Sequence, residues 1–316
     1  MVFTGIVGLA AVLVALCGVA VGLNWLAPLT TARWLRNALR SLAGLQAKTV
    51  DVNGQRFPYL VGGTGEPLVL VHGFTADKDT WGAVARHLTS KYTVIALDLP
   101  GFGDAARDPH ASYSLDVQVE NLRAFLHRMG LNPVHLGGSS MGGGVVALYA
   151  AKYPQEVASL WLIDAAATGE VTRSDLMRHY DTTGEFPLLV QTLAQQLAKL
   201  ALVFGRRQYI PHSLAYAMAN EAKRDFDFHG QILKTIRDDI PIEARYSGLQ
   251  TPTLIVTGDQ DRVVPPESVH TLARVFLHSQ VKVMPGVGHL PMVEAPKAVA
   301  HDYLAFRAGR LPKCYS

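Results

Sequence analysis

The stretch from Gly137 to Gly143 constrains the fold of this chain more than any other. An apolar run from Pro133 to Leu136 precedes it, and a helical pattern from Val145 to Lys152 follows. The sequence therefore predicts a strand, a tight glycine-rich turn and a helix, in that order. Within the turn, residues 138–142 fit the pattern G-x-S-x-G, in which flanking glycines let a strained backbone lift the central serine clear of its neighbours.

This pattern makes Ser140 the predicted nucleophile. Its neighbour Ser139 does not compete, because Met141 stands two residues beyond it and would crowd a turn that needs glycine. A glycine-rich turn formed by chance is the alternative interpretation. The weight of the motif therefore depends on the structural context that the rest of the chain supplies.

The composition is that of a chain with a large apolar core. Its 316 residues are 49% hydrophobic and 17% charged, which favours one core with room for an insertion or a small second domain. The formal net charge is only +3, and no basic stretch is interleaved with aromatic residues, so nucleic acid is excluded as a partner. The two cysteines, Cys17 and Cys314, offer neither a disulfide framework nor a metal-binding spacing.

The N-terminus predicts a membrane anchor. No charged side chain occurs from Met1 to Ala32, and the apolar stretch from Phe3 to Leu26 would span roughly 36 Å as a helix, enough to cross a bilayer. A cleaved signal peptide is disfavoured because no lysine or arginine precedes Arg33. A helix buried in a soluble protein is the remaining alternative. We therefore predict a single transmembrane helix at the start of an anchor covering residues 1–47.

An amphipathic segment from Ala32 to Leu45 is expected to follow the span and to lie in the membrane interface. Trp25 and Trp34 are suited to the headgroup level, and three arginines alternate at helical spacing with three leucines. These six residues are Arg33, Arg36, Arg40, Leu35, Leu39 and Leu42.

Small residues form one stripe on the predicted span. Ala11, Ala15, Gly18 and Gly22 recur at spacings of four, three and four residues, and the last two form a G-x-x-x-G pattern. Helices in a bilayer associate by close packing of this kind, so the stripe predicts a homodimer contact. The alternative is that glycine and alanine are simply common in membrane helices.

From residue 48 to the end, strand and helix patterns alternate as β-α-β units, which predicts an α/β domain with a mostly parallel sheet covered by helices on both faces. A β-hairpin around Asn53-Gly54 opens the domain. Between Asp164 and Thr251 no strand-like run recurs, so we expect a helical cap at about residues 167–247, with helices over 187–204 and 212–238. Outside the cap, strands are expected at 67–71, 93–97, 133–136, 159–163, 253–256 and 280–284, and helices at 79–88, 115–129 and 145–152.

A serine nucleophile needs a general base, and that base needs a carboxylate to hold its tautomer and stabilise its charged form. Asp261 lies on a loop after the strand at 253–256, and His289 lies on a loop after the strand at 280–284. The carboxyl ends of such strands are where the sites of open α/β sheets gather. The sequence thus predicts a triad of Ser140, Asp261 and His289. Asp164, at the end of its own strand, is an alternative acid, and Asp259 is interpreted as a turn-capping residue.

From about residue 50 to residue 307 the chain resembles the α/β-hydrolase family. The resemblance rests on the motifs at 70–74 (Leu-Val-His-Gly-Phe), 98–103 (Asp-Leu-Pro-Gly-Phe-Gly), 138–143 (Gly-x-Ser-Met-Gly-Gly), 258–261 (Gly-x-x-Asp) and 288–296 (Gly-His-x-x-x-x-Glu-x-Pro). Residues 72–81 and the N-terminal anchor resemble the membrane-bound monoacylglycerol lipase and lysophospholipase branch and its bacterial relatives with phospholipase A activity. Asp104 departs from the family pattern, in which many members carry a small hydroxyl residue there.

The resemblance implies an oxyanion hole formed by the backbone N–H groups of Phe74 and Met141. It also implies a membrane-anchored serine ester hydrolase that takes a lipid ester, releases a fatty acid and needs no metal or organic cofactor. Two alternatives stay open, namely a carbon–carbon bond hydrolase of ring-cleavage products and a catalytically idle, membrane-tethered binding protein.

The expected location is a membrane, with a single N-terminal pass and the bacterial inner membrane as its expected site. Basic residues after the span place the catalytic domain in the cytoplasm by the positive-inside tendency, whereas some bacterial relatives face the periplasm. The sequence leaves the side of the membrane open.

Overall fold

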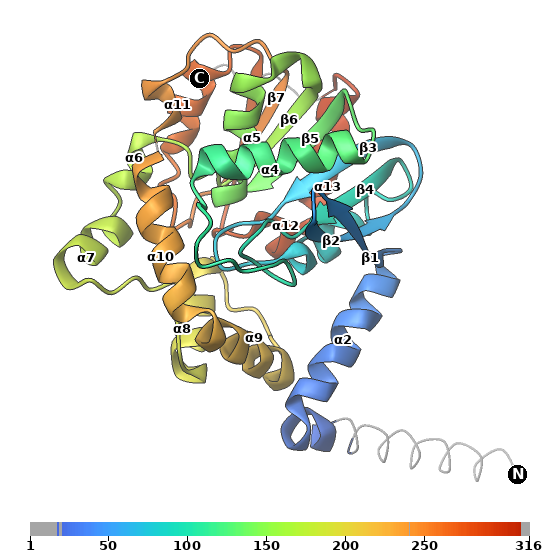
Figure 1. Ribbon diagram of the computed structural model, residues 1–316, viewed down its shortest axis with the longest axis vertical. Coiled ribbons are helices and arrows are strands. Elements are labelled where there is room, and N and C mark those ends of the chain that lie inside the picture. Colours follow the sequence, from blue (N-terminus) through green and yellow to red (C-terminus); the bar gives the residue numbers. More distant parts are fainter. Residues whose placement is uncertain (1–17, 19–20, 240, 311–316) are drawn as a thin grey trace, which may run out of the picture.

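The computed structural model describes residue 18, residues 21–239 and residues 241–310 (Figure 1). Its centre is an eight-stranded sheet with the order β1-β2-β4-β3-β5-β6-β7-β8. The strands are β1 (Gln46–Val52), β2 (Gln55–Gly62), β3 (Glu66–Val71), β4 (Tyr92–Leu97), β5 (Val134–Ser139), β6 (Val157–Ile163), β7 (Thr253–Gly258) and β8 (Ser279–Met284).

The sheet is parallel except at its first edge, as the alternating pattern predicts. β1 pairs antiparallel with β2, and β2 pairs antiparallel with β4, while every pairing from β4 to β8 is parallel. The hairpin between β1 and β2 turns at Asn53 and Gly54, with φ angles of 54° and 81°. Positive φ at both positions is what a two-residue hairpin turn requires, so this prediction is confirmed.

Helices cover both faces of the sheet (Figure 1). One face packs against α4 (Leu115–Arg128), α5 (Met141–Lys152) and α11 (Ser268–Val275), with Phe125, Val146 and Leu272 among the buried contacts. The other face packs against α3 (Gly82–Ala85), α12 (Pro291–Glu294) and α13 (Pro296–Arg307). The two helical layers leave the central strands buried on both sides, which explains their near-continuous apolar sequences.

The helix predicted over residues 79–88 differs from the structure. The segment begins as a 3-10 helix, η1 (Lys78–Trp81), and the α-helical part is only the four residues of α3. Asp77 accepts a hydrogen bond from the Asp79 backbone N–H and so caps the tighter turn. A second 3-10 helix, η2 (Pro154–Glu156), separates α5 from β6.

A helical cap separates β6 from β7, as the absence of strand patterns predicts. Its elements are α6 (Gly169–Thr172), α7 (Asp175–Thr183), α8 (Leu193–Val203), α9 (His212–Arg224), α10 (Phe226–Ile236), η3 (Arg237–Asp239) and η4 (Ile242–Ala244). The single helix predicted over 212–238 is wrong, because the chain breaks at Asp225 between α9 and α10. Asp225 accepts hydrogen bonds from Arg107 and Arg224 there, which fixes the corner. The helix predicted over 187–204 begins only at Leu193, after a Thr192 capping box.

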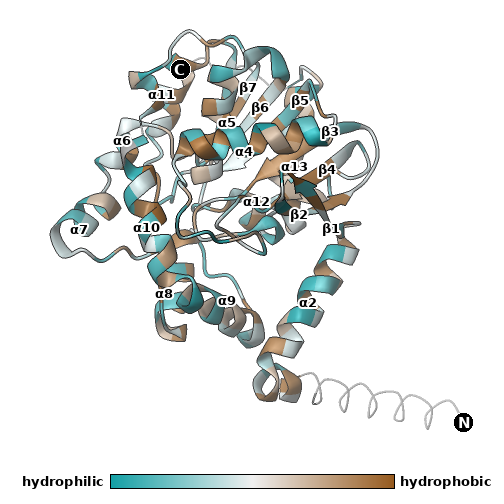
Figure 2. Cartoon of the chain, viewed as in Figure 1, coloured by the Kyte–Doolittle hydropathy of each residue, from teal (hydrophilic) through white to brown (hydrophobic). Residues whose placement is uncertain are grey.

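The segment predicted to be an interfacial helix forms α2 (Pro28–Leu42). This helix begins beside α9 of the cap and ends just before β1 of the sheet (Figures 1 and 2). Two of its arginines form ion pairs within the protein. Arg36 forms a two-pronged ion pair with Glu221 of α9, and Arg40 forms one with Asp79 of η1, with N–O distances of 2.6–2.8 Å. The helix therefore links the cap to the core. Trp34 and Leu42 are left 76% and 75% exposed.

The predicted transmembrane span, Phe3 to Leu26, lies mostly outside the described residues. Within the part that the structure describes, no helix combines the length and the apolar character needed to cross a bilayer. Of the small-residue stripe, Ala11 and Ala15 also lie outside the described residues.

Candidate active site

Ser140 stands at a sharp corner between β5 and α5. Its φ of 53° and ψ of −122° lie outside the regions that ordinary residues adopt, and its backbone is held by three hydrogen bonds. Its N–H donates to the Ile163 carbonyl, and its carbonyl accepts from Ala166 and Gly144. The strained corner that the motif predicts is therefore present and locked by the neighbouring strand.

The glycines flanking Ser140 are needed for close backbone approach. A Cβ on Gly138 would lie 2.3 Å from the Gly142 carbonyl oxygen, and a Cβ on Gly142 would lie 2.3 Å from the Val71 carbonyl oxygen. Both distances are far inside van der Waals contact, so only glycine lets α5 start this close to β3 and β5. The Ser140 hydroxyl forms no hydrogen bond within the described part of the chain, and such catalytic bonds commonly tighten only when substrate is bound.

Asp261 and His289, the other two residues of the predicted triad, lie next to each other. His289 Nδ1 lies 2.7 Å from Asp261 Oδ2, and both side chains are buried. Asp261 Oδ1 accepts from the backbone N–H groups of Val263 and Val264, at 2.7 and 3.0 Å. These three donors fix the carboxylate, which in turn directs His289 Nε2 away from Asp261.

The loop that carries His289 is fixed by Glu294, the glutamate of the 288–296 motif. Its two carboxylate oxygens accept from the N–H groups of Gly288 and Gly205, at 2.8 and 2.9 Å. The His289 N–H donates to the Val203 carbonyl at the end of α8. The base is thus joined directly to the cap, and sequence reasoning assigned Glu294 no role although it stands within the motif.

The predicted oxyanion donors lie on two sides of Ser140. Met141 is the first residue of α5, where backbone N–H groups have no partner within the helix. Phe74 follows Gly73, where an added Cβ would lie 3.0 Å from the Ser140 Cβ. In the described chain neither the Phe74 nor the Met141 N–H is used in a hydrogen bond, so both are free to bind an oxygen.

His72 orders the loop before Phe74. Its Nε2 accepts from the Leu99 N–H at 3.1 Å, which leaves Nδ1 protonated to donate to the Gly73 carbonyl at 2.8 Å. Complete burial lowers the pKa of His72 and keeps the ring neutral. His72 therefore ties the loop to the residue after Asp98 and is not placed to exchange protons with Ser140.

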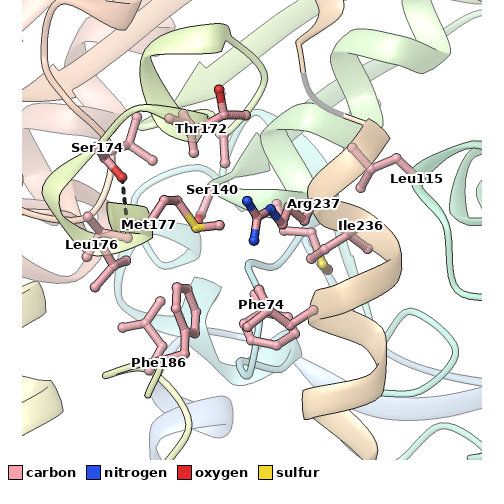
Figure 3. Close-up of a pocket in the computed structure, with 17 residues that line it drawn as sticks. Phe74, Leu115, Ser140, Thr172, Ser174, Leu176, Met177, Phe186, Ile236 and Arg237 are labelled. Carbon is pink, nitrogen blue, oxygen red and sulfur yellow. Dashed lines mark hydrogen bonds between the residues drawn. The ribbon is translucent and has the colours of Figure 1, made fainter. Parts of the chain in front are cut away.

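An apolar cavity opens above Ser140 (Figure 3). Its empty space is about 640 Å³, part of which is open to solvent. Its walls come from the loop that carries Phe74, from the cap and from the loop that carries Asp261 and Val263. Phe74, Met177, Phe186, Leu188, Ile236 and Val263 are among them. Arg237 also lines the cavity, with its guanidinium among the apolar side chains (Figure 3), and it pairs with Asp181 at 2.5 Å. The shape and lining suit a long apolar group that ends at the serine.

Lys199 and His229, two side chains of the cap, bind it to the loops that carry Thr75 and Gly101. Lys199 of α8 donates to Thr75 Oγ1 at 2.6 Å, and burial lowers the pKa of this lysine to about 8. His229 of α10 contacts the Gly101 carbonyl at 3.1 Å and stacks on Phe102. Burial lowers the pKa of His229 to about 4, so it stays neutral. Nothing in the sequence pattern around either residue signals these contacts.

Asp164, the alternative acid, lies beside the predicted pair and makes no hydrogen bond to His289. Each of the residues Asp164, Asp261 and His289 offers one side-chain atom, and these three atoms lie within 4.8 Å of one another. Hydroxyl and N–H donors already engage Asp164 Oδ1 and both Asp261 oxygens. The donor set therefore favours hydrogen bonding over coordination of a metal. Asp259 accepts from the Gly286 N–H on the loop after β8, so this hydrogen bond connects two loops and is not the turn cap that the sequence suggests.

Comparison with known proteins gives a consistent result. Residues 66–296 match the family model described as the alpha/beta hydrolase fold. Lipase 3 of Moraxella sp. (strain TA144) is 36% identical over 314 residues, covering 96% of this chain and 97% of that protein. Monoacylglycerol lipase ABHD6 of Rattus norvegicus is 29% identical, covering 84% of each chain. A crystal structure of a membrane phospholipase A is 38% identical with a TM-score of 0.86, covering 96% of this chain and 98% of that one.

Proposed function

The chain belongs to the α/β-hydrolase fold family, and from this membership and the site we propose that it is a serine ester hydrolase of the lipase and phospholipase A type. It releases fatty acids from glycerolipids through an acyl-enzyme. The observation that carries the proposal is the position of Ser140, on a strained corner at the base of an apolar cavity and next to the Asp261 loop. An ester with a long acyl chain is the substrate class that needs both features.

In the proposed reaction the Ser140 hydroxyl attacks the acyl carbonyl carbon. His289 Nε2 accepts the hydroxyl proton as the carbon–oxygen bond forms, and Asp261 stabilises the resulting imidazolium. The N–H groups of Phe74 and Met141 receive the developing oxyanion, and donors of this kind typically contribute about 3 kcal/mol each.

Collapse of the tetrahedral intermediate breaks the ester bond. His289 gives its proton to the leaving alcohol, and the acyl group stays on Ser140. A water molecule then attacks the acyl-enzyme, and His289 again takes the proton. The bond between the acyl carbon and Ser140 Oγ breaks, His289 returns the proton to Oγ, and the fatty acid leaves. The walls formed by Phe186, Leu188 and Ile236 are suited to hold the acyl chain during both steps.

We expect the full chain to release fatty acid from vesicles that contain a monoacylglycerol, a lysophospholipid or a diacyl phospholipid. Comparing the three rates by mass spectrometry of the released acid identifies the headgroup preference. A dienoic ring-cleavage product, assayed in parallel, tests the carbon–carbon hydrolase alternative. Faster cleavage of that compound than of any lipid ester would contradict the proposal.

We further propose that residues 1–47 anchor the enzyme to a membrane, with a single N-terminal pass in a bacterial inner membrane. In this proposal residues 48–316 form the hydrolase domain, with its cap at about 167–247. The uncharged apolar sequence before Arg33 supports the span. The surface of α2 supports a second contact with lipid, since Trp34 and Leu42 stay exposed while Arg36 and Arg40 are used within the protein.

The contact between α2 and lipid can be measured through Trp34. The chain has four tryptophans, of which Trp81 and Trp161 are completely buried. In proteoliposomes made with brominated lipids we expect quenching of tryptophan emission that decreases in Trp34→Phe, the remainder coming from Trp25, which is 62% exposed and lies in the proposed span. Trp81→Phe is the matched control, because Trp81 is completely buried. Equal quenching of Trp34→Phe and wild type would show that α2 does not contact the membrane surface.

The predicted homodimer contact stays a hypothesis. Within the described residues a Cβ added to Gly18 or Gly22 meets no atom within 4 Å, so this side of the segment is open for a partner helix. The stripe would bring two α2 helices side by side at the membrane surface.

A further inference from the structure

Two buried carboxyl groups, Asp164 and Asp261, lie together at the carboxyl ends of β6 and β7. They are 2% and 7% exposed, and His289 completes the cluster at 4%. Two carboxylates this close and this buried do not both ionise, because burial and mutual repulsion each disfavour the second negative charge. A proton or a cation must be shared between them.

The hydrogen bonds identify Asp261 as the ionised member. It accepts from His289 Nδ1, from the Val263 N–H and from the Val264 N–H, all at 3.0 Å or less. A carboxylate that accepts several N–H bonds is stabilised in its charged form.

Asp164 has a different environment. Its Oδ1 accepts from Thr257 Oγ1 at 2.7 Å and from the Gly258 N–H at 3.1 Å, while its Oδ2 is buried and has no hydrogen-bond partner among the described residues. Burial, followed by the charge of Asp261, raises the pKa of Asp164 well above its usual range. A protonated carboxyl would carry its hydrogen on the oxygen that has no other partner and lies beside an ionised carboxylate.

In the described part of the chain, the elements around Asp164 bring no other charged group to this proton. β6, β7 and the adjoining part of α5, from Met141 to Ala150, contain no ionisable residue besides a tyrosine. From the loops after β7 and β8, the titratable groups that face Asp164 are Asp261 and His289. Asp164 itself has a φ of 44°, a left-handed conformation that the surrounding structure must impose.

We propose that Asp164 is a protonated positioning residue, whose carboxyl hydrogen bonds to Asp261 and holds that carboxylate in place for His289. The inference rests on the proposed function, because it assigns Asp164 a role behind the Ser140–His289–Asp261 triad. The arrangement keeps a single negative charge in the cluster. Loss of the Asp164 proton at alkaline pH adds a second charge, so activity that depends on the protonated form is present at lower pH and declines as the pH rises.

The matched pair of variants is Asp164→Asn and Asp164→Leu. An asparagine keeps the acceptor for Thr257 and Gly258, replaces the acidic hydroxyl with an N–H donor and cannot ionise. Leucine removes donor and acceptor. We expect Asp164→Leu to have a kcat about tenfold or more below that of Asp164→Asn, the effect typical of losing a charge-assisted hydrogen bond. We also expect any alkaline decline of kcat to disappear in Asp164→Asn.

Infrared spectroscopy tests the protonation directly. At neutral pH the wild-type protein should show a C=O absorption band of protonated carboxyls that is sensitive to D₂O. Asp164→Asn should lose the part that comes from Asp164 and keep the part that comes from Asp77, whose pKa burial raises to about 7. Asp225→Asn is the control and should leave the band unchanged, because hydrogen bonds from Arg224 and Arg107 outweigh burial and lower the pKa of Asp225.

Three results would overturn the inference. They are an unchanged infrared band in Asp164→Asn, loss of activity in Asp164→Asn as severe as in Asp261→Asn, and activity that a chelator removes and a divalent cation restores. None of these affects the proposed function. That proposal fails separately, if Ser140→Ala retains esterase activity.

Discussion

Replacing Ser140 with alanine is expected to lower kcat for ester hydrolysis by about 10⁴-fold to 10⁶-fold, the range seen when a nucleophile that acts together with its base is removed. His289→Ala should lose a similar amount, and Asp261→Asn about 10⁴-fold, because the amide turns the imidazole to the wrong tautomer. The physical reason is that the three side chains act as one unit. The double variant Ser140→Ala/His289→Ala should therefore be no slower than Ser140→Ala alone.

The matched control for this series is Ser139→Ala. Ser139 is the neighbouring serine, and its buried hydroxyl has no hydrogen-bond partner among the described residues, so its removal costs little. Labelling with a fluorophosphonate should be as fast in Ser139→Ala as in wild type and absent in Ser140→Ala. Thermal unfolding of each variant shows whether the fold is intact. Labelling of Ser140→Ala at the wild-type rate would mean that another residue is the nucleophile, and no labelling of wild type would favour an idle binding protein.

The largest expected effect on stability is that of Lys78→Met. Lys78 Nζ lies 2.6 Å from Asp98 Oδ2 and 2.7 Å from Asp104 Oδ2, and the Lys78 and Asp98 side chains are 3% and 0% exposed. Without the ammonium group, the buried Asp98 charge loses its counter-charge and keeps only the backbone N–H groups of Lys78 and Asp104 as donors. Breaking a buried pair in this way typically costs about 3–5 kcal/mol of unfolding free energy. Urea unfolding followed by circular dichroism measures the loss.

Two further variants separate the charge from the side chain. Lys91→Met changes an exposed lysine and should alter the unfolding free energy by about 0.5 kcal/mol or less. Adding Asp98→Asn to Lys78→Met removes the stranded charge and should recover part of the stability, because the desolvation penalty falls with it. A Lys78→Met protein as stable as Lys91→Met would show that the buried pair contributes nothing. The pair also explains Asp104, the departure from the family pattern, since its carboxylate is the second partner of Lys78.

Local sequence was sufficient for the parts of the site that depend on a few adjacent residues. The corner at Ser140 follows from Gly138 and Gly142, because any Cβ there collides with backbone atoms regardless of what packs around it. The hairpin at Asn53–Gly54 follows from the same kind of steric rule. The order of Ser140, Asp261 and His289 could also be predicted, because each side chain follows a strand whose apolar run is recognisable by itself.

The tertiary structure decided whatever depends on partners that are distant in the sequence. It put Asp164 next to Asp261 and His289, although the two acids follow different strands that lie far apart in the sequence. It paired Arg36 with Glu221, 185 residues away, and Lys199 with Thr75, 124 residues away. A charged or polar side chain can satisfy its hydrogen bonds with many partners, so its own sequence neighbourhood does not select one. Only the packing of the cap and α2 against the sheet brings a single partner within reach and removes the water that would otherwise compete.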